Sequence, residues 1–515
     1  MIFNVENYIQ KLKEHDQLIK CIGCEDILKS EVINLEYNSK NVTINTMFVC
    51  KGVGKNFKLD YLKEAIVKGA FVYVSSNEYD VDIPCILVKD AFISLSILAS
   101  IYYNNPEKDL NLIGITGTKG KSTTTYYIKS ILDEYSKEME KKDTAVISSI
   151  DTYDGVEKFE SHLTTPESLE LYKHFKNSVS SGIENLVMEV SSQALKIGRV
   201  HGLKFDIGVF LNISEDHISP IEHPDFDDYF KSKLKIFSNC ETSCINLDSD
   251  FSDEILKKAR EDSKEVITFS IKNKDADIYA YDIKKDGFNT IFNVRTPSYT
   301  EEFILTMPGL FNVENALAAI SVAYKMNIPK KYIYMGLKIA RSSGRMEVYH
   351  TSDERIMAIV DYAHNKLSFE KLFESIKNEY PDRNIIIIFG CPGKKAYLRR
   401  RDLGIVAGKN SDKIYLVAED PGYEPVEQIS NEIAEYVSEY MDNYEMIEDR
   451  GVAIKEAIKY AKENYKKTVI LITGKGNETR QKYGSEYLPC MSDVQYVKKY
   501  IDEYNKEEVG KVNEI

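Results

Sequence analysis

The sequence lacks three features: a long hydrophobic run, an excess of basic residues and a closely spaced set of cysteines and histidines that would complete a zinc site. No apolar run approaches the ~20 residues that a membrane span needs, and the N-terminal stretch MIFNVENYIQKLKEHDQ has no signal-peptide core. The net charge of −14 argues against a nucleic-acid partner, because binding a phosphate backbone requires a basic face. We therefore expect a cytoplasmic protein without a membrane or nucleic-acid partner.

The cysteines do not form a disulfide framework. Eight of them are spread along the chain, which is typical of reduced thiols in the cytoplasm. Cys21 and Cys24 form a C-x-x-C motif, but no second pair and no histidine cluster lies nearby to complete a zinc site. By itself, the motif does not indicate a metal or redox function.

The length indicates several domains. A chain of 515 residues is too long for one core, and a prior near 150 residues per domain suggests roughly three. Short strand-like runs alternate with helical patterns throughout, which is typical of α/β domains with parallel sheets covered by helices. We place the domains at residues 1–108, 109–341 and 342–515.

The stretch LNLIGITGTKGKSTTTYYIKSILDEY predicts a strand, a tight loop and a helix. Such a loop leaves backbone N–H groups at a helix N-terminus, where an anion such as phosphate is favoured. In it, Lys121 would reach the terminal phosphates and Ser122 would hold Mg²⁺. The spacing departs from the standard phosphate loop, because Ile115 stands where a first glycine is usual, but the loop still predicts a nucleoside triphosphate site.

Polar residues follow two later strands of the middle region. NLVMEVSSQAL delivers Glu189, and NISEDHIS delivers Asp216 and His217. Singly, each is more typical of a capping or solvated residue. Together, at strand ends behind a phosphate loop, they indicate groups that could meet Mg²⁺ near the triphosphate.

The sequence resembles the Mur ligases, the ATP-dependent amide-bond formers of cell-wall precursor synthesis, and among them the MurE type. The resemblance runs through essentially the whole chain. It rests on ordered blocks that include GITGTKGKSTTT, HLTTPESL, MEVSSQAL, NISEDHIS, GLFNVENALAAI, SGRMEV, VDYAHN, FGCPG and ITGKGNE. It implies the three-domain Mur ligase architecture: an N-terminal UDP-substrate domain, a central ATPase domain with a mostly parallel sheet, and a Rossmann-like C-terminal domain that binds the amino acid.

The resemblance also implies roles for individual residues, position by position. The nucleotide contacts would be Thr118, Gly120, Lys121, Ser122, Asn315, Arg345 and Asp361. The metal-site residues would be Ser122, Glu189, His217 and Lys233. The contacts to the UDP-linked muramoyl dipeptide would be Ser39, Thr164, Thr165, Ser192 and Arg199. The amino-acid contacts would be Arg400, Glu419, Asp420, Gly474 and Glu478.

Lys233 has a special place among these residues, because the family lysine at this position carries a CO₂-derived carbamate that ligates a second Mg²⁺. Spacing alone does not separate it from Lys231 and Lys235; the alignment from Tyr229 selects Lys233.

The implied reaction transfers the γ-phosphate of ATP to a substrate carboxylate, and the amine of an amino acid then attacks the acyl phosphate. Phosphorylation itself activates the carboxylate, so no protein nucleophile is required. Mg²⁺, Lys121 and the loop N–H groups would neutralise charge on the phosphoryl oxygens. Closure of the third domain would exclude water.

The block that selects the amino acid departs from the family pattern. Relatives that add meso-diaminopimelate carry DNPR, whose arginine pairs with the distal carboxylate; this chain reads EDPG, with Gly422 in place of the arginine. The lost contact is worth about 1.5–3 kcal/mol, while Glu419 and Asp420 suit a cationic side chain. We predict L-lysine or ornithine over meso-diaminopimelate, unless Arg480 or Lys482 replaces the missing guanidinium.

Other departures leave alternatives open. Lys119 replaces the family asparagine of the phosphate loop, Asn477 replaces the histidine of GKGHE, and Ser39 and Lys40 stand in a weak version of the uridine motif. The chain could be a paralogue that acts on a different carboxylate, or a catalytically silent ATP-binding regulator. The retained catalytic residues argue against a silent protein, and we expect a monomeric enzyme.

Overall fold

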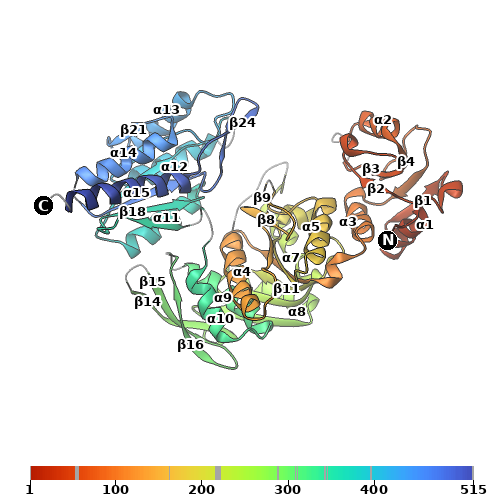
Figure 1. The fold of residues 1–515 in the computed structure, drawn as a ribbon, viewed down its shortest axis with the longest axis horizontal. Coiled ribbons are helices and arrows are strands. Elements are labelled where there is room, and N and C mark those ends of the chain that lie inside the picture. Colours follow the sequence, from red (N-terminus) through yellow and green to blue (C-terminus); the bar gives the residue numbers. More distant parts are fainter. Residues whose placement is uncertain are drawn as a thin grey trace. The chain divides into compact units, whose positions relative to one another are not determined.

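The computed structural model describes residues 2–512 except 53–56, 162, 215–221, 287–288, 308, 310, 342–343, 345, 395–396 and 465, and it does not describe the side chains of 508–512. The chain forms two compact units (Figure 1). The first consists of Met1–Ala280, Val294–Glu301 and Glu314–Gly336, the second of Tyr281–Asn293, Glu302–Val313 and Leu337–Ile515. Among the described residues, no helix combines the length and the apolar character needed to cross a membrane.

The N-terminal part of the first unit contains a five-stranded sheet with the order β1-β5-β4-β3-β2. All neighbouring strands are parallel except the edge strand β1, which runs antiparallel to β5. Alternate residues point to opposite faces: Met47 and Val49 join one apolar cluster, while Phe48 and Cys50 join another. The elements are β1 (Leu18–Ile22), β2 (Asn34–Glu36), β3 (Thr46–Val49), β4 (Ala70–Ser75), β5 (Cys85–Val88), α1 (Val5–Glu14), α2 (Leu59–Lys68), α3 (Ala91–Tyr102), and the short 3₁₀ helices η1 (Glu25–Ile27), η2 (Ser39–Asn41) and η4 (Pro106–Asp109).

An eleven-stranded sheet follows, with the order β16-β15-β14-β13-β12-β11-β6-β10-β7-β8-β9. Its strands are β6 (Asn111–Thr116), β7 (Ala145–Ile147), β8 (Asp151–Tyr153), β9 (Lys158–Glu160), β10 (Asn185–Glu189), β11 (Phe205–Phe210), β12 (Cys240–Asn246), β13 (Glu265–Ser270), β14 (Ile278–Asp286), β15 (Asn289–Arg295) and β16 (Thr300–Leu305). The helices along this stretch are α4 (Lys121–Glu138), α5 (Ser168–Ser180), α6 (Ser192–Lys196), α7 (Phe226–Leu234), η5 (Phe237–Asn239), α8 (Ser252–Asp262), α9 (Phe311–Lys325) and α10 (Lys330–Ile339).

The strand order of this sheet predicts a ligand site at the carboxyl end of β6. Strands β10 and β11 lie on either side of β6 and run parallel to it. The chain crosses β6 when it passes from β10 to β11, so the direction of winding changes there. Open α/β sheets bind ligands at the carboxyl ends of the strands at such a point.

The second unit contains a six-stranded sheet with the order β17-β18-β22-β19-β20-β21, parallel except for the edge strand β17. Its elements are β17 (Glu347–His350), β18 (Ile356–Asp361), β19 (Asn384–Phe389), β20 (Lys413–Leu416), β21 (Tyr444–Met446), β22 (Thr468–Thr473), the hairpin β23 (Arg480–Tyr483) and β24 (Glu486–Pro489), α11 (Lys366–Glu379), α12 (Tyr397–Asn410), α13 (Val426–Val437), α14 (Arg450–Glu463) and α15 (Asp493–Val512).

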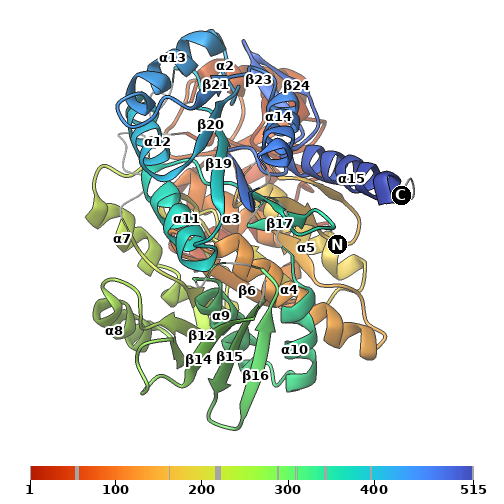
Figure 2. The same ribbon diagram turned by 90° about the vertical axis from the view of Figure 1, so that its left-hand side faces the viewer.

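Two helical layers cover this sheet. Ile387 and Leu471 pack with residues of α11, α12 and α13, whereas Ile388 and Ile472 pack with residues of α14 and α15. Figure 2 shows β19, β20 and β21 between α12 and α14. The near-continuous apolar strands are buried on both faces, as a parallel sheet requires.

The predicted α/β fold class with mostly parallel sheets is confirmed. The boundaries at 108 and 341 stay predictions. The first falls between the five-stranded sheet and β6, inside the first unit, and the second falls close to Leu337, where the long segment of the second unit begins.

Candidate active site

The phosphate loop connects β6 to α4, as the sequence predicted. Gly120, directly before the helix, has φ +87°, and a Cβ atom there would lie 2.3 Å from Oδ1 of Asn315. Only glycine meets both the backbone and the space requirement. The same close approach places Asn315, a predicted nucleotide contact from α9, against the loop.

Two lysines converge on this loop. Lys121 Nζ donates to the carbonyl oxygens of Gly117 (3.0 Å) and Thr118 (3.3 Å). Lys233, only 2% exposed, comes from α7 and donates to the same Gly117 oxygen at 2.9 Å. The ring of Tyr229 lies under the Lys233 ammonium, and the Tyr229 hydroxyl is 3.1 Å from Oγ1 of Thr118. Two ammonium groups therefore donate to the carbonyl oxygens of this loop, and α7 holds one of them in place.

Ser122 and Glu189, predicted metal-site residues, are joined through Ser149. The Ser149 hydroxyl lies 3.1 Å from Ser122 Oγ and donates to Glu189 Oε1 at 3.2 Å, and its backbone N–H donates to the same oxygen at 2.9 Å. Glu189 Oε2 receives no hydrogen bond from the described part of the chain. Hydroxyl and carboxylate oxygens fit Mg²⁺, a hard cation that prefers oxygen ligands. Sequence reasoning missed Ser149, although it lies near the end of the strand-like run TAVISSI.

The loop after β11 is tied to the phosphate loop through Asn212. Its carbonyl accepts from the Thr118 N–H at 3.0 Å, and its side chain accepts from the Lys119 N–H at 2.9 Å. Sequence reasoning did not select Asn212. His217, as well as Arg345, lies outside the described residues, so their predicted roles stay predictions.

The predicted substrate residues Thr165 and Arg199 form one buried group. Thr165 Oγ1 donates to the carbonyl of Glu189 at 2.9 Å, and Arg199 donates to the Thr165 carbonyl at 3.1 Å and to Glu167 at 2.7 Å. Glu167 also pairs with Lys51 at 2.7 Å. Thr164, beside them, is partly exposed.

Ser192 is buried, and its hydroxyl lies 3.0 Å from Nε2 of His223, which is itself fully buried. Asp228 accepts from His223 Nδ1 at 2.6 Å and from Lys196 at 2.7 Å. This chain of contacts joins α6 to α7. Ser192 thus lies in a packed network, whereas the preceding Ser191 is the more exposed N-cap of α6.

Ser39, the predicted contact in the N-terminal sheet, is buried at η2. Its hydroxyl donates to Glu64 at 2.7 Å, and its carbonyl accepts from Lys68 at 3.0 Å. The neighbouring Lys40 is exposed.

In the second unit, Glu419 follows β20 and lies against the glycines that follow β19 and β22. A Cβ atom on Gly474 would lie 2.2 Å from Glu419 Oε2, and one on Gly390 would lie 3.0 Å from Glu419 Cβ. Burial raises the pKa of this carboxyl group to about 7, against the opposing charges of Arg450, Arg399 and Lys475. Glu419 forms no hydrogen bond or ion pair through its side chain with the described residues.

Asp420 and Glu478 share one cation. Lys475, buried, donates to Asp420 Oδ1 at 3.0 Å and also to Glu478, which accepts a 2.5 Å hydrogen bond from the Tyr362 hydroxyl. Asp420 has φ +47° and accepts the Lys482 N–H at 2.8 Å, so the hairpin β23–β24 fixes its side chain. Sequence reasoning did not select Lys475, although it lies in the block ITGKGNE.

Arg400 is 2% exposed, and its terminal nitrogens are occupied. It pairs with Glu424 at 2.7 Å and Glu432 at 2.6 Å and donates to the carbonyl of Pro392. A substrate carboxylate would have to displace Glu424 to reach these nitrogens. Asp361, at the end of β18, accepts the N–H groups of Met346 (2.9 Å) and Ala363 (2.8 Å) and so fixes the segment before β17.

Beneath Glu419, a buried ion pair fixes the strand ends. Arg450 binds Asp493 with two nitrogens (2.9 and 2.7 Å) and donates to the carbonyls of Thr473 and Ala418. The second Asp493 oxygen also accepts the Gly476 N–H at 3.2 Å. This pair therefore positions both the segment with Glu419 and the loop with Lys475.

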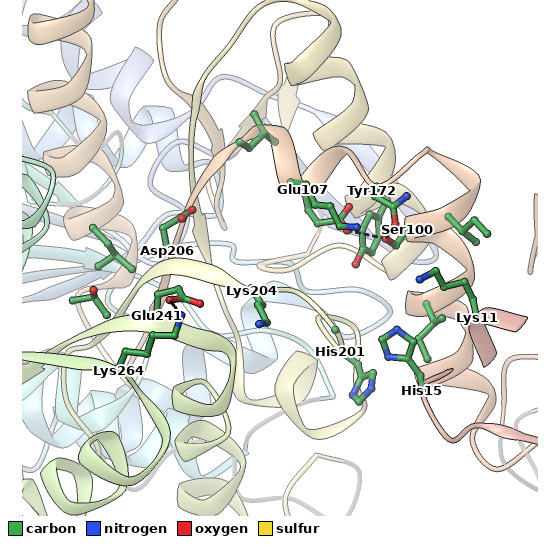
Figure 3. A pocket seen from close by; sticks show the side chains of 18 of the residues that line it. Lys11, His15, Ser100, Glu107, Tyr172, His201, Lys204, Asp206, Glu241 and Lys264 are labelled. Carbon is green, nitrogen blue, oxygen red and sulfur yellow. Dashed lines mark hydrogen bonds and ion pairs between the residues drawn. The ribbon is translucent and has the colours of Figure 1, made fainter. Parts of the chain in front are cut away.

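A cavity of about 930 Å³ in the first unit lies elsewhere (Figure 3). Asp206, Glu241 and Lys264 line it at the starts of β11, β12 and β13, opposite α1 with Lys11 and His15. The phosphate loop follows the carboxyl end of β6, which is parallel to β11. The cavity thus lies near the amino ends of these parallel strands, whereas the phosphate loop lies at the carboxyl end of β6.

Comparisons with known proteins agree with this geometry. Residues 115–323 match the Mur ligase middle domain, and residues 344–476 match the Mur ligase, glutamate ligase domain. The UDP-N-acetylmuramoyl-L-alanyl-D-glutamate–L-lysine ligase of Enterococcus faecalis is 35% identical over 92% of this chain and 92% of its own length. The UDP-N-acetylmuramyl-tripeptide synthetase of Ligilactobacillus salivarius is 35% identical over 98% and 100%.

Solved structures share the fold. A UDP-N-acetylmuramoyl-L-alanyl-D-glutamate–2,6-diaminopimelate ligase superposes with a TM-score of 0.68 at 22% identity, covering 98% of this chain and 99% of its own. A folylpolyglutamate synthase of Mycobacterium tuberculosis superposes with a TM-score of 0.59 at 14% identity and covers 74% of this chain and 92% of its own. With relatives this similar over nearly the full length, the chain belongs to the Mur ligase family and is an ATP-dependent acid–amino-acid ligase.

Proposed function

We propose that this ligase adds L-lysine, in preference to meso-diaminopimelate, to UDP-N-acetylmuramoyl-L-alanyl-D-glutamate in the peptidoglycan precursor pathway of the cytoplasm. ATP would phosphorylate the D-glutamyl carboxylate, and the lysine amine would displace phosphate from the acyl phosphate. The names of the Enterococcus and Streptococcus relatives, 35–36% identical, support this substrate pair.

One observation supports the cationic substrate most directly. Glu419 is a buried carboxyl group that makes no side-chain hydrogen bond or ion pair with the described residues, and its neighbour Asp420 adds a second carboxylate. Gly422 offers no guanidinium for a distal carboxylate. A terminal ammonium would pair with Glu419, whereas a second carboxylate would meet like charge.

The residues of the phosphate loop would bind the triphosphate. Lys121 would exchange its carbonyl partners for phosphate oxygens, which are stronger acceptors because they are charged. Ser122 and Glu189 would hold Mg²⁺, which neutralises charge on the transferring phosphoryl group. Thr165 and Arg199 would position the UDP-linked substrate by ordering the segment around Glu189.

Lys233 is the proposed carbamate site. The Lys233 ammonium would first lose one proton. The neutral amine would then add to CO₂, forming an N–C bond and releasing a second proton, so that a cation becomes an anion. The carbamate keeps one N–H group, which can continue to donate to the Gly117 carbonyl. A buried anion in this position would ligate a second Mg²⁺.

The test is phosphate release from ATP by the purified protein with Mg²⁺, bicarbonate and UDP-N-acetylmuramoyl-L-alanyl-D-glutamate, screened against lysine, ornithine and meso-diaminopimelate. We expect release that requires both the UDP-dipeptide and lysine or ornithine. Saturable use of diaminopimelate without use of lysine would refute the proposed specificity. Release with another carboxylate acceptor, and none with the UDP-dipeptide, would identify a paralogue instead.

A further inference from the structure

The C-x-x-C motif in the N-terminal sheet brings two thiols of different character together. Cys21 lies near the end of the edge strand β1 and is partly exposed, whereas Cys24 is buried. Gly23 between them has φ +65°, a conformation that glycine adopts without strain and that turns the chain back. The turn places the buried Cys24 thiol three residues after the partly exposed Cys21, at the end of β1.

The surroundings hold the buried thiol in place. Cys24 Sγ lies 3.6 Å from the carbonyl oxygen of Ile22 and 3.5 Å from that of Cys85. Cys85 lies on β5 and pairs with Ile22 in the antiparallel register. Cys24 is therefore enclosed by its own turn and by the neighbouring strand, whereas Cys21 is partly exposed.

We propose that Cys21 and Cys24 form a thiol–disulfide exchange site that reduces low-molecular-weight disulfides, with Cys21 as the attacking and Cys24 as the resolving sulfur. The Cys21 thiolate attacks one sulfur of the disulfide, forms a mixed disulfide and expels one thiolate. Cys24 then loses its proton and attacks Cys21 Sγ, which forms the internal disulfide and expels the second thiolate. Two electrons pass from the protein dithiol to the small disulfide, which leaves as two thiols.

The electrostatics agree with this order of events. The hydrogen bond from Cys24 lowers the pKa of Cys21 to about 7, helped by Lys13 of α1 and opposed by burial and by Glu25 of η1. The same contact and burial raise the pKa of Cys24. A partly exposed thiol with a lowered pKa beside a buried one is the arrangement in which the first attacks and the second resolves.

The other described cysteines contrast with this pair. Burial raises the pKa values of Cys50, Cys85, Cys240, Cys244, Cys391 and Cys490. Of these, only Cys490 is exposed, so it serves as the matched control. The proposed exchange does not depend on the ligase reaction.

Tryptic peptide mapping tests the proposal on the intact protein. Cleavage after Lys20 and Lys29 releases CIGCEDILK, which carries both cysteines on one peptide. The protein is incubated with oxidised glutathione, and its free thiols are then alkylated. We expect this peptide to carry no alkyl group and to be lighter by about two hydrogens than the reduced, unalkylated peptide. Dithiothreitol should restore the reduced mass.

Three variants separate the roles of the cysteines. Cys24→Ala should accumulate a glutathione adduct on Cys21, and the midpoint of its alkylation rate against pH should rise from about 7 toward the ordinary thiol value near 8.5. Cys490→Ala should leave the wild-type pattern unchanged. The proposal is wrong if the wild-type peptide stays reduced while Cys490 takes up glutathione, or if Cys21→Ala still gives an adduct on Cys24.

Discussion

At the residue scale, the Glu419 carboxyl group is buried and makes no side-chain hydrogen bond or ion pair with the described residues. Its pKa of about 7 means that the carboxyl group is neutral below that pH and anionic above it. Attraction to the lysine ammonium should therefore strengthen as the pH rises, so we expect KM for lysine to fall between pH 6 and 8. Initial rates across this range provide the measurement.

The matched variants for this prediction are Glu419→Gln and Glu427→Gln, the latter an exposed glutamate on α13. Glu419→Gln should remove the pH step and raise KM at pH 8 by roughly ten- to a hundredfold, equivalent to a charged hydrogen bond of about 1.5–3 kcal/mol. Glu427→Gln should behave as the wild type. A wild-type KM that does not change between pH 6 and 8 would contradict the role of Glu419.

Lys121 is the second prediction at this scale. Lys121→Ala removes the ammonium that contacts the loop carbonyls, and we expect kcat to fall at least about a hundredfold, because phosphoryl transfer depends on positioning and charge stabilisation. Lys137→Ala, at the exposed end of the same helix, is the control for folding and should keep full activity. Unchanged turnover in Lys121→Ala would remove the proposed mechanism.

At the scale of elements, we expect the turn between β20 and α13 to set the preference between lysine and meso-diaminopimelate. Gly422 has φ +59°, and its N–H donates to the Lys482 carbonyl at 3.0 Å beside the hairpin β23–β24. Gly422→Arg should raise the ratio of kcat/KM for meso-diaminopimelate over lysine at least about tenfold by supplying a bidentate partner. It should also cost about 1–2 kcal/mol of stability, because a side chain is strained in this backbone conformation.

Gly422→Ala is the control, since it carries the same backbone strain without the guanidinium. It should lose similar stability in urea unfolding and keep the wild-type preference for lysine. Equal substrate ratios in the two variants would show that the arginine does not act through this turn.

At the scale of the whole molecule, ligand binding and stability are linked. Mg²⁺–ATP at a hundred times its Kd should raise the free energy of unfolding by about 2.7 kcal/mol, if it binds the folded form alone. Calorimetry of the wild type and of Lys121→Ala measures this, and the variant should lose most of the gain at the same ATP concentration. An equal gain in both would place the nucleotide away from the phosphate loop.

Local sequence patterns predicted much of the architecture. Buried runs such as NLIGIT and TVILIT became central parallel strands, because apolar residues on both faces are stable only under two layers of helices. The loop between Thr116 and Lys121 was predictable, because its glycines and its place between strand and helix are local features. The proximity of Ser122 and Glu189 followed from two strand ends on one edge of a sheet.

Side-chain partners were less predictable. Arg400 matched a family position for the amino-acid carboxylate, yet its burial against Glu424 and Glu432 depends on the packing of α12 beside α13. The bond between Ser192 and His223 likewise joins residues 31 positions apart. No periodicity or residue spacing in the sequence predicts either pairing.

The sequence by itself determined the order of strands and helices, the phosphate loop and the family, because these depend on local periodicity, backbone preference and matched motifs. The tertiary structure decided which polar groups are already paired. It gave Arg400 and Ser39 internal partners, buried Glu419 without a side-chain hydrogen bond or ion pair among the described residues, and buried Cys24 while leaving Cys21 partly exposed. The physical reason is that hydrogen bonding, burial and pKa depend on atoms distant in sequence that only the packed chain brings into contact.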